Sequence, residues 1–326
     1  MLERLLLPVL SLGSMSLVFG AGLALASRKF AVEKDPRADA IREILPGANC
    51  GGCGHPGCDG FAAAVVLGKA PVNGCPVGGC TVAEKIGVIM GVEVSVAERN
   101  VARVLCQGDC NQAIDKFKYE GIEDCVAASM LSEGPKGCKY GCLGLGTCER
   151  VCPFDAIHVN DKGIAVVDRD KCTACNKCVV ACPKNIIELI PESSEVQVAC
   201  ISNDKGKDVK ANCKVGCIGC QICVKACKFD AITFENNLAK IDYEKCVNCM
   251  VCAEKCPTKS IYADFSKRKT ASIDQELCTG CTLCKRKCQF EAIEGERREK
   301  HHILEDKCTG CSQCTQVCPT KAISMV

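Results

Sequence analysis

The sequence is poor in the residues that build large cores and active sites. It has no Trp, and aromatic residues make up only 4% of its 326 residues. One large hydrophobic core is therefore not expected, and small domains need another source of stability. There is no Gly-x-Gly-x-x-Gly nucleotide loop, and the four His are scattered, with His301 and His302 expected on a solvated turn. We therefore expect no substrate chemistry from this chain alone, and no nucleic-acid partner.

Cysteine, in contrast, is abundant, with 34 residues. From Cys138 onward most of them follow a ladder, Cys-x-x-Cys-x-x-Cys-x-x-x-Cys, often with Pro next. Three close thiolates and a fourth beyond a turn have the spacing of iron–sulfur ligands. The five regular ladders are Cys172, Cys175, Cys178, Cys182; Cys217, Cys220, Cys223, Cys227; Cys246, Cys249, Cys252, Cys256; Cys278, Cys281, Cys284, Cys288; and Cys308, Cys311, Cys314, Cys318.

Bound clusters change both the stability and the charge expected of the chain. Metal binding contributes folding free energy to domains with small cores. The formal net charge is +2, and each oxidised cluster adds about two negative charges, so the loaded protein is expected to be acidic. The alternative is zinc, because paired Cys-x-x-Cys motifs also build zinc sites. In that case the chain would be a membrane-tethered zinc-binding interaction protein.

The N-terminus carries the one long apolar segment. Residues 5–27 contain no charge, which is long enough for a helix that crosses a membrane. The alternative is a cleaved signal peptide, because Ala24-Leu25-Ala26 resembles a cleavage site, although the run exceeds the usual apolar region of about 7–15 residues. Arg28, Lys29 and Lys34 follow the segment, whereas only Arg4 precedes it. The positive-inside rule thus predicts a single-pass plasma-membrane protein with its bulk on the cytoplasmic side.

A repeat organises the rest of the chain. The marker Cys-x-x-x-Ala/Ser/Ile-Ile begins at Cys152, Cys182, Cys227, Cys256, Cys288 and Cys318, and these six half-modules pair into three modules. We predict an α+β fold with an anchor at 1–28, a small iron–sulfur domain at 33–92, a connecting segment at 93–137, a module at 138–190, an insertion at 191–216, and modules at 217–265 and 270–326. A helix is expected around Gln112 to Tyr119. A hairpin is expected at 157–167, with its turn at Asn160–Gly163.

The repeat resembles the bacterial two-cluster ferredoxin over residues 134–326. In that family the fourth Cys of each ladder binds the cluster of the other ladder. The resemblance implies four clusters in the last two modules, on Cys217, Cys220, Cys223, Cys256; Cys227, Cys246, Cys249, Cys252; Cys278, Cys281, Cys284, Cys318; and Cys288, Cys308, Cys311, Cys314.

The first module departs from this pattern. Its ladder reads Cys142, Leu145, Cys148, Cys152, with leucine in place of the second thiol. Cys138 is the nearest Cys that could replace it. We therefore expect one cluster on Cys138, Cys142, Cys148 and Cys182, and another on Cys152, Cys172, Cys175 and Cys178.

A Gly-rich stretch precedes the repeat and has a different spacing, with Cys50, Cys53 and Cys58 close together and Cys75 further on. A zinc knuckle is the alternative for this stretch alone. Combined with the apolar segment and the ferredoxin modules, it closely resembles the B subunit of Rnf complexes, in a long form with extra modules. The resemblance implies a cluster on Cys50, Cys53, Cys58 and Cys75.

The resemblance also implies a function and partners. The chain would take electrons from reduced soluble ferredoxin and pass them to a flavin- and NADH-binding subunit, within a membrane complex that translocates Na⁺ or H⁺. The alternative is a polyferredoxin subunit of another membrane hydrogenase or quinone oxidoreductase. Basic triplets at Lys267–Lys269 and Lys285–Lys287 are candidates for docking an acidic ferredoxin, the alternative being ordinary solvated turns.

Seven [4Fe-4S] clusters use 28 of the 34 cysteines and leave Cys80, Cys106, Cys110, Cys125, Cys200 and Cys213. An eighth cluster on Cys106, Cys125, Cys200 and Cys213 is one interpretation. The other is that these are ordinary buried thiols, which are common in proteins.

Overall fold

The computed structural model describes residues 2–29, 35–94 and 98–326, apart from the side chains of residues 2–11 and 28. It begins with one long helix, α1 (Leu2–Lys29). Within the described part of the chain, no helix meets the combined length and hydropathy needed for a membrane crossing. The start of the expected span, up to residue 11, lies outside the described side chains, as does Lys34. From residue 12 onward the apolar side chains of α1 are exposed, for example Leu17 at 75% and Leu23 at 71%.

Three helices form the N-terminal unit: α2 (Pro36–Ile44), α3 (Gly57–Val66) and α4 (Gly79–Met90). The side chain of Asp35 caps α2 by accepting a hydrogen bond from the Arg37 backbone N–H at 2.9 Å. Ile41, Phe61 and Ile86 each come from a different helix and are buried in one small core. Helical periodicity thus brings one apolar face of each helix inward.

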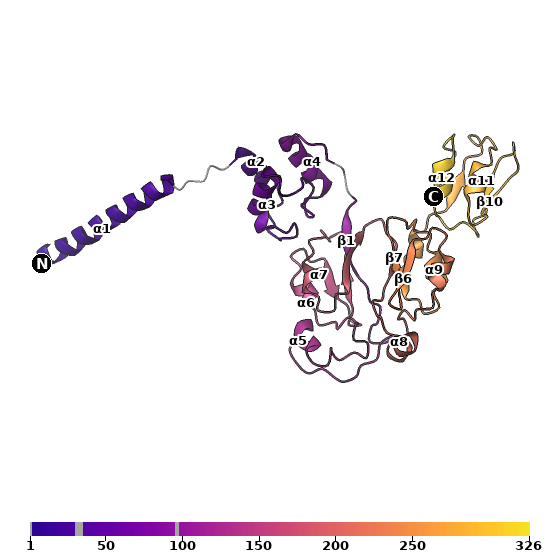
Figure 1. Ribbon diagram of the computed structural model, residues 1–326, viewed down its shortest axis with the longest axis horizontal. Coiled ribbons are helices and arrows are strands. Elements are labelled where there is room, and N and C mark those ends of the chain that lie inside the picture. Colours follow the sequence, from indigo (N-terminus) through magenta and orange to yellow (C-terminus); the bar gives the residue numbers. More distant parts are fainter. Residues whose placement is uncertain (1, 30–34, 95–97) are drawn as a thin grey trace.

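The three ferredoxin-like modules follow one another from the magenta to the yellow part of the chain in Figure 1. Each has two antiparallel two-stranded ribbons. The inner ribbons are hairpins: β2 (Ile157–Val159) with β3 (Ala165–Val167), β6 (Ile232–Glu235) with β7 (Leu238–Ile241), and β10 (Ile293–Glu294) with β11 (His302–Ile303). The outer ribbons join the ends of each module: β1 (Asn100–Val104) with β4 (Ile187–Pro191), β5 (Val196–Val198) with β8 (Ile261–Ala263), and β9 (Ala271–Ile273) with β12 (Ile323–Met325). The expected mixture of helices and strands is confirmed.

Two of the three outer ribbons use a strand from a segment that the sequence analysis placed between modules. Strand β1 lies in the expected connecting segment 93–137, yet Val104 pairs with Ile187 across the first module. Strand β5 lies in the expected insertion 191–216, yet Val198 pairs with Ile261. These short strands carry no cysteine and no repeat marker, so the ladder pattern could not indicate them.

Each ladder folds into the same turn followed by a short helix. The helices are α6 (Thr147–Arg150), α7 (Lys177–Ala181), α9 (Ile222–Ala226), α10 (Val251–Glu254), α11 (Leu283–Lys287) and α12 (Gln313–Val317). The residue before each helix adopts a positive φ, such as 67° at Asn176 and 74° at Gly146. Gly146 follows Leu145, so the irregular ladder keeps the backbone of the regular ones although it lacks the second thiol.

Two local predictions have opposite outcomes. The hairpin at 157–167 is confirmed, and the Asn160 side chain accepts hydrogen bonds from the Lys162 and Ile164 backbones at 3.1 Å. The prediction of a helix around residues 112–119 is wrong. This stretch is extended, with single β-bridges from Ala113 to Cys213 and from Asp115 to Lys136. Two short helices complete the region, α5 (Cys125–Ser129) and α8 (Gly206–Asn212).

The pair of histidines also differs from expectation. His301 is 0% exposed, and its ring packs against Gly295, whose added Cβ would come within 2.9 Å of it. His302, on β11, is exposed and lies 3.4 Å from a Glu294 carboxylate oxygen. The alternation of sides along a strand explains why neighbouring histidines have opposite environments.

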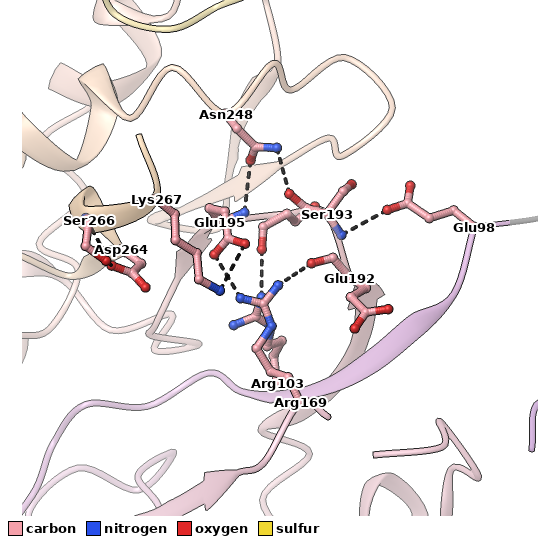
Figure 2. A network of polar contacts seen from close by, with 11 residues as sticks. Glu98, Arg103, Arg169, Glu192, Ser193, Glu195, Asn248, Asp264, Ser266 and Lys267 are labelled. Atoms are coloured by element: carbon pink, nitrogen blue, oxygen red, sulfur yellow. Dashed lines mark hydrogen bonds and ion pairs between the residues drawn. The ribbon is translucent and has the colours of Figure 1, made fainter. Parts of the chain in front are cut away.

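A polar network joins the first and second modules (Figure 2). The Arg169 guanidinium, on the first module, donates to the Glu195 carboxylate at 2.8 Å, and Lys267 lies 3.5 Å from the same carboxylate. The Asn248 side chain accepts from the Glu195 backbone N–H at 3.0 Å and donates to the Ser193 carbonyl at 2.9 Å. The 3₁₀ turn η1 (Phe265–Lys267) carries Lys267 into this seam. The linker at 192–195 is thereby held by side chains from both modules.

Candidate metal centre

Three cavities are each lined by four thiols of one expected cluster. They enclose about 340, 360 and 360 Å³ of empty space, including space open to solvent. We name them the Cys178 set (Cys152, Cys172, Cys175, Cys178), the Cys223 set (Cys217, Cys220, Cys223, Cys256) and the Cys314 set (Cys288, Cys308, Cys311, Cys314). In each set, one thiol comes from the other ladder of its module.

The fit to a metal group depends on the kind of group. Among the described residues, no three His, Cys, Asp or Glu side chains converge as ligands of a single ion. A four-iron cubane makes a different demand, since each thiolate binds a separate iron at its own corner of the cube. Four thiols around one cavity meet that demand. These residues therefore fit a [4Fe-4S] cluster.

Burial and crowding of like charges perturb these thiols. Burial, together with the neighbouring Cys172, Cys175 and Cys152 thiolates, raises the pKa of Cys178 to about 12. The same causes raise the pKa of Cys223 to about 11, with Cys217, Cys220 and Cys256 as neighbours. Thiolates packed this closely away from water need a cation to compensate their charge. Iron provides that compensation when bound.

The repeat marker has a structural reason. The backbone N–H of the residue four positions after the ladder's last Cys donates to that sulfur: Ala156 to Cys152 at 3.4 Å, Ala292 to Cys288 at 3.4 Å and Ala322 to Cys318 at 3.3 Å. The intervening turn requires a positive φ, as at Asp155, Glu291 and Lys321. Hydrogen bonds to cluster sulfurs are one of the factors that set cluster potentials. The marker therefore identifies a sulfur-binding turn as well as a ligand.

The other regular ladders also bring their thiols together. In the Cys252 set (Cys227, Cys246, Cys249, Cys252), burial raises the pKa of Cys252, and the three other thiolates of the set contribute. In the Cys284 set (Cys278, Cys281, Cys284, Cys318), burial raises the pKa of Cys284, with Cys281 and Cys278 as neighbours. Cys318 packs against the core that contains Cys284.

In the N-terminal unit, the expected ligands form the Cys75 set (Cys50, Cys53, Cys58, Cys75). Burial raises the pKa of Cys75, and the Cys53 and Cys50 thiolates add to the rise. The Cys58 backbone N–H, at the start of α3, donates to the Asn49 side chain at 2.8 Å. Cys53, Cys58 and Cys75 pack against the same helical core. The Gly-rich loop therefore holds its thiols against the three helices.

The irregular ladder recruits a different thiol from the expected Cys138. Burial, together with the neighbouring thiolates of Cys142, Cys125 and Cys182, raises the pKa of Cys148 to about 12. The Cys125 backbone N–H donates to the Thr147 hydroxyl at 2.7 Å, and this hydroxyl donates to Asp124 at 2.8 Å. Asp124 also caps α5, so α5 is held beside Cys148. We call Cys125, Cys142, Cys148 and Cys182 the Cys148 set.

Cys138 lies elsewhere. The structure thus differs from two expected groupings, the one that placed Cys138 with Cys148 and the one that placed Cys125 with Cys200. One cavity of about 520 Å³ is lined by Cys106, Cys138, Cys200 and Cys213, the Cys200 set. The sequence analysis chose Cys138 for the irregular ladder because it is near in sequence. The bridge between Asp115 and Lys136 instead directs this segment toward Cys213.

Neighbouring sets lie close enough to interact electrostatically along the molecule. The Cys50 thiolate contributes to the raised pKa of Cys175, after burial, so the Cys75 and Cys178 sets are adjacent. Burial and the Cys223 thiolate raise the pKa of Cys252, linking both sets of the second module. Burial and the Cys311 thiolate raise the pKa of Cys249, linking the second and third modules. The thiol sets therefore form a series from the N-terminal unit to the last module.

The two basic triplets differ in their surroundings. Lys267 is paired with Glu195, and Arg268 donates to Glu254 at 2.5 Å and to the Cys249 carbonyl at 3.0 Å. Lys285, Arg286 and Lys287 are exposed on α11, next to two expected ligands of the third module, Cys284 and Cys288. The second triplet is thus the one more available to a partner.

Comparisons with known proteins agree with this arrangement. The family "Putative Fe-S cluster" matches residues 45–77, "4Fe-4S dicluster domain" families match 216–260 and 271–325, and "4Fe-4S binding domain" matches 165–188. The B subunit of the Na⁺-translocating ferredoxin:NAD⁺ oxidoreductase complex of Acetobacterium woodii is 50% identical, over 83% of this chain and 81% of that protein.

Two further relatives carry related names. The B subunit of an ion-translocating oxidoreductase complex of Methanosarcina acetivorans is 45% identical, over 77% of this chain and 95% of that protein. The B subunit of the proton-translocating ferredoxin:NAD⁺ oxidoreductase complex of Clostridium ljungdahlii is also 45% identical, over 76% of this chain and 89% of that protein. The chain therefore belongs to the family of B subunits of Rnf-type ion-translocating ferredoxin:NAD⁺ oxidoreductase complexes.

Proposed function

We propose that this chain is the electron-relay subunit of an Rnf-type complex, accepting electrons from reduced ferredoxin and passing them toward a flavin- and NADH-binding subunit. The complex as a whole would couple ferredoxin:NAD⁺ oxidoreduction to Na⁺ or H⁺ translocation. The chain binds several iron–sulfur clusters, and its partners are the other subunits of a membrane-associated complex. Bound clusters supply one-electron transfer at low potential.

One observation carries this proposal: the thiol sets are neighbours in a series, close enough to interact electrostatically, from Cys50 near Cys175 to Cys249 near Cys311. A protein that used metals only for stability would gain nothing from such a series. We assign seven clusters to the Cys75, Cys148, Cys178, Cys223, Cys252, Cys284 and Cys314 sets. In this assignment, backbone N–H groups and buried strands orient the thiols and exclude water.

We further propose that α1 is the membrane anchor. It has 28 residues, about 42 Å as a helix, and residues 5–27 carry no charge. The exposure of Leu17, Val18 and Leu23 in an isolated helix supports an apolar environment for them. Arg28 and Lys29 favour a cytoplasmic location for the rest of the chain.

For ferredoxin we propose docking at Lys285–Lys287. The three cations are exposed, and α11 carries Cys284 and immediately precedes Cys288. Complementary charge raises the rate of encounter with an acidic partner more than it raises affinity.

The test is ferredoxin-dependent NAD⁺ reduction by anaerobically purified membrane complex. Complex that lacks this chain should retain NADH oxidation by an artificial acceptor but lose the ferredoxin-dependent reaction. Adding the reconstituted chain back should restore it. If the depleted complex reduced NAD⁺ from ferredoxin at the full rate, the relay function would be refuted.

A further inference from the structure

We infer that Cys106, Cys138, Cys200 and Cys213 bind an eighth [4Fe-4S] cluster, located between the first and second modules. The role of this site rests on the proposed function, but its existence does not. The observations that carry it concern the cavity, the segments that deliver the thiols, the groups around the sulfurs, and the position of the set.

The cavity matches those of the ladder sets. It has four cysteines in its lining, as the cavities of the Cys178, Cys223 and Cys314 sets do. The sulfurs of Cys106 and Cys213 face the same backbone, because a Cβ added to Gly108 would lie 3.7 and 3.4 Å from them. Glycine at this position leaves room beside both thiols.

Four separate segments deliver the four thiols. Cys106 follows β1, and the Leu105 N–H donates to the Ile186 carbonyl at 2.7 Å. Cys200 follows β5, and Ala199 is held to Ser260 at 2.8 Å. Cys213 ends α8 and bridges Ala113. Cys138 follows Gly137, whose N–H donates to Ile114 at 2.7 Å. Regular backbone pairing thus fixes the start of each ligand segment.

The surroundings of these sulfurs match those of the ladder thiols. Backbone N–H groups two residues further on, from Tyr140, Ser202 and Val215, donate to the sulfurs of Cys138, Cys200 and Cys213. The same i+2 hydrogen bond reaches the sulfurs of Cys175, Cys249 and Cys311. Cys106 accepts from the Cys142 N–H at 3.5 Å. Donors aimed at sulfur stabilise a thiolate, which is the form that binds metal.

A buried cation accompanies the set. Lys136 is 7% exposed, and its ammonium donates to the Gly108 carbonyl at 2.6 Å. No carboxylate pairs with it in the part of the chain that the structure describes. A buried ammonium without an opposite charge is costly. A cluster with four thiolates carries about two negative charges and would compensate it.

The Cys200 set lies between a set of the first module and a set of the second module. The Cys142 backbone N–H donates to the Cys106 sulfur at 3.5 Å, and Cys142 belongs to the Cys148 set. The Cys217 backbone N–H donates to the Cys200 sulfur, and Cys217 belongs to the Cys223 set. The Cys200 set therefore touches one set of each module and joins them.

The test is the iron and sulfide content of the full chain, reconstituted anaerobically. We expect about 32 iron atoms per chain, and about 28 in the Cys138→Ala and Cys200→Ala variants. The double variant Cys138→Ala/Cys200→Ala should also hold about 28, because both residues bind one cluster. Cys125→Ala/Cys200→Ala should hold about 24, because these residues bind different clusters. The control Cys110→Ala, at an exposed cysteine, should retain all the iron.

Three results would overturn the inference: about 28 irons in the unaltered chain with no loss in Cys200→Ala, one zinc in place of four irons, or additive iron loss in Cys138→Ala/Cys200→Ala. Lys136→Met keeps all four thiols of the Cys200 set, so it tests the site even if the variants that remove a thiol misfold. It should retain about 32 irons and make one midpoint potential more negative, and unchanged potentials would count against the site. A chain with about 32 irons that ferredoxin does not reduce would refute the relay function and leave this site intact.

Discussion

Leu145 offers a gain-of-ligand test of the first module. It occupies the position of the second ladder cysteine, and the residue after it has φ 74°, close to the 67° of Asn176 in the regular ladder of the same module. Leu145→Cys should therefore place a thiol where the other ladders have one. In the Cys125→Ala background, the new thiol should replace the ligand that was lost, because the backbone of the turn is already correct.

The expected magnitudes follow from the ligand count and from burial. Cys125→Ala leaves three thiols in the Cys148 set and should cost about four irons per chain, which Leu145→Cys should restore. Truncating a fully buried Leu costs about 2–5 kcal/mol, and Leu145 is only half-buried, so about 1–2 kcal/mol is expected. That loss is small beside a typical stability of about 5–15 kcal/mol. The rescue should therefore not be hidden by unfolding.

The assay is iron and sulfide content with EPR of the dithionite-reduced chain. Leu67→Cys in the Cys125→Ala background is the control, since Leu67 is 67% exposed and belongs to the N-terminal unit. It should restore no iron. The reasoning would be refuted if Cys125→Ala kept its full iron content, or if Leu145→Cys failed to restore the four missing irons while the protein remained folded.

The remaining predictions concern docking, the module seam and the contact of the N-terminal unit. Replacing residues 285–287 by Glu should slow the reduction of this chain by ferredoxin and weaken the salt dependence of that rate. The same change at the three exposed lysines in 205–210 should have neither effect. Equal rates in the two variants would reject the docking site. Glu195→Gln should lower the free energy of local opening around β5, measured by hydrogen exchange, by about 2 kcal/mol. The reason is that the ion pair of Glu195 with Arg169 is only 17–21% exposed. The control Glu120→Gln, in an exposed ion pair, should change this free energy by less than about 0.5 kcal/mol. Gly52→Ala would set a Cβ 2.7 Å from the Cys175 carbonyl oxygen and should weaken the magnetic coupling between the clusters of the Cys75 and Cys178 sets. Gly22→Ala, which meets open space on α1, is the control, and a Gly52→Ala EPR spectrum identical to that of the unaltered chain would contradict the reasoning.

The ladders could be predicted because their geometry is local. Three thiols within seven residues lie on one turn, and the turn is imposed by the ladder itself, as the shared positive φ after the second position indicates. The hairpin at 157–167 was predictable for the same reason, because its turn chemistry lies between its strands. Membership of the Rnf family likewise rested on motifs that can be recognised within short stretches.

The cysteines outside the ladders could not be assigned in this way. Cys125 and Cys138 are both candidates to replace the missing thiol at Leu145, and proximity in sequence favoured Cys138, whereas the structure places Cys125 beside Cys148. The hydrogen bond from the Cys125 N–H to the Thr147 hydroxyl and the bridge from Asp115 to Lys136 separate the two, and both are contacts between distant segments. Strands β1 and β5 were missed because strands of only three to five residues acquire a partner only when the module closes.

The sequence by itself determined the metal chemistry, the repeat and the family, because ligand spacing and turn residues act within a few positions of the chain. Only the tertiary structure decided which of the remaining thiols meet. The Cys200 set is assembled from the ends of β1, β5 and α8 and from the segment at 136–138, and no short-range pattern links these segments. Their meeting depends on strand pairing across whole modules, which is a property of the folded chain.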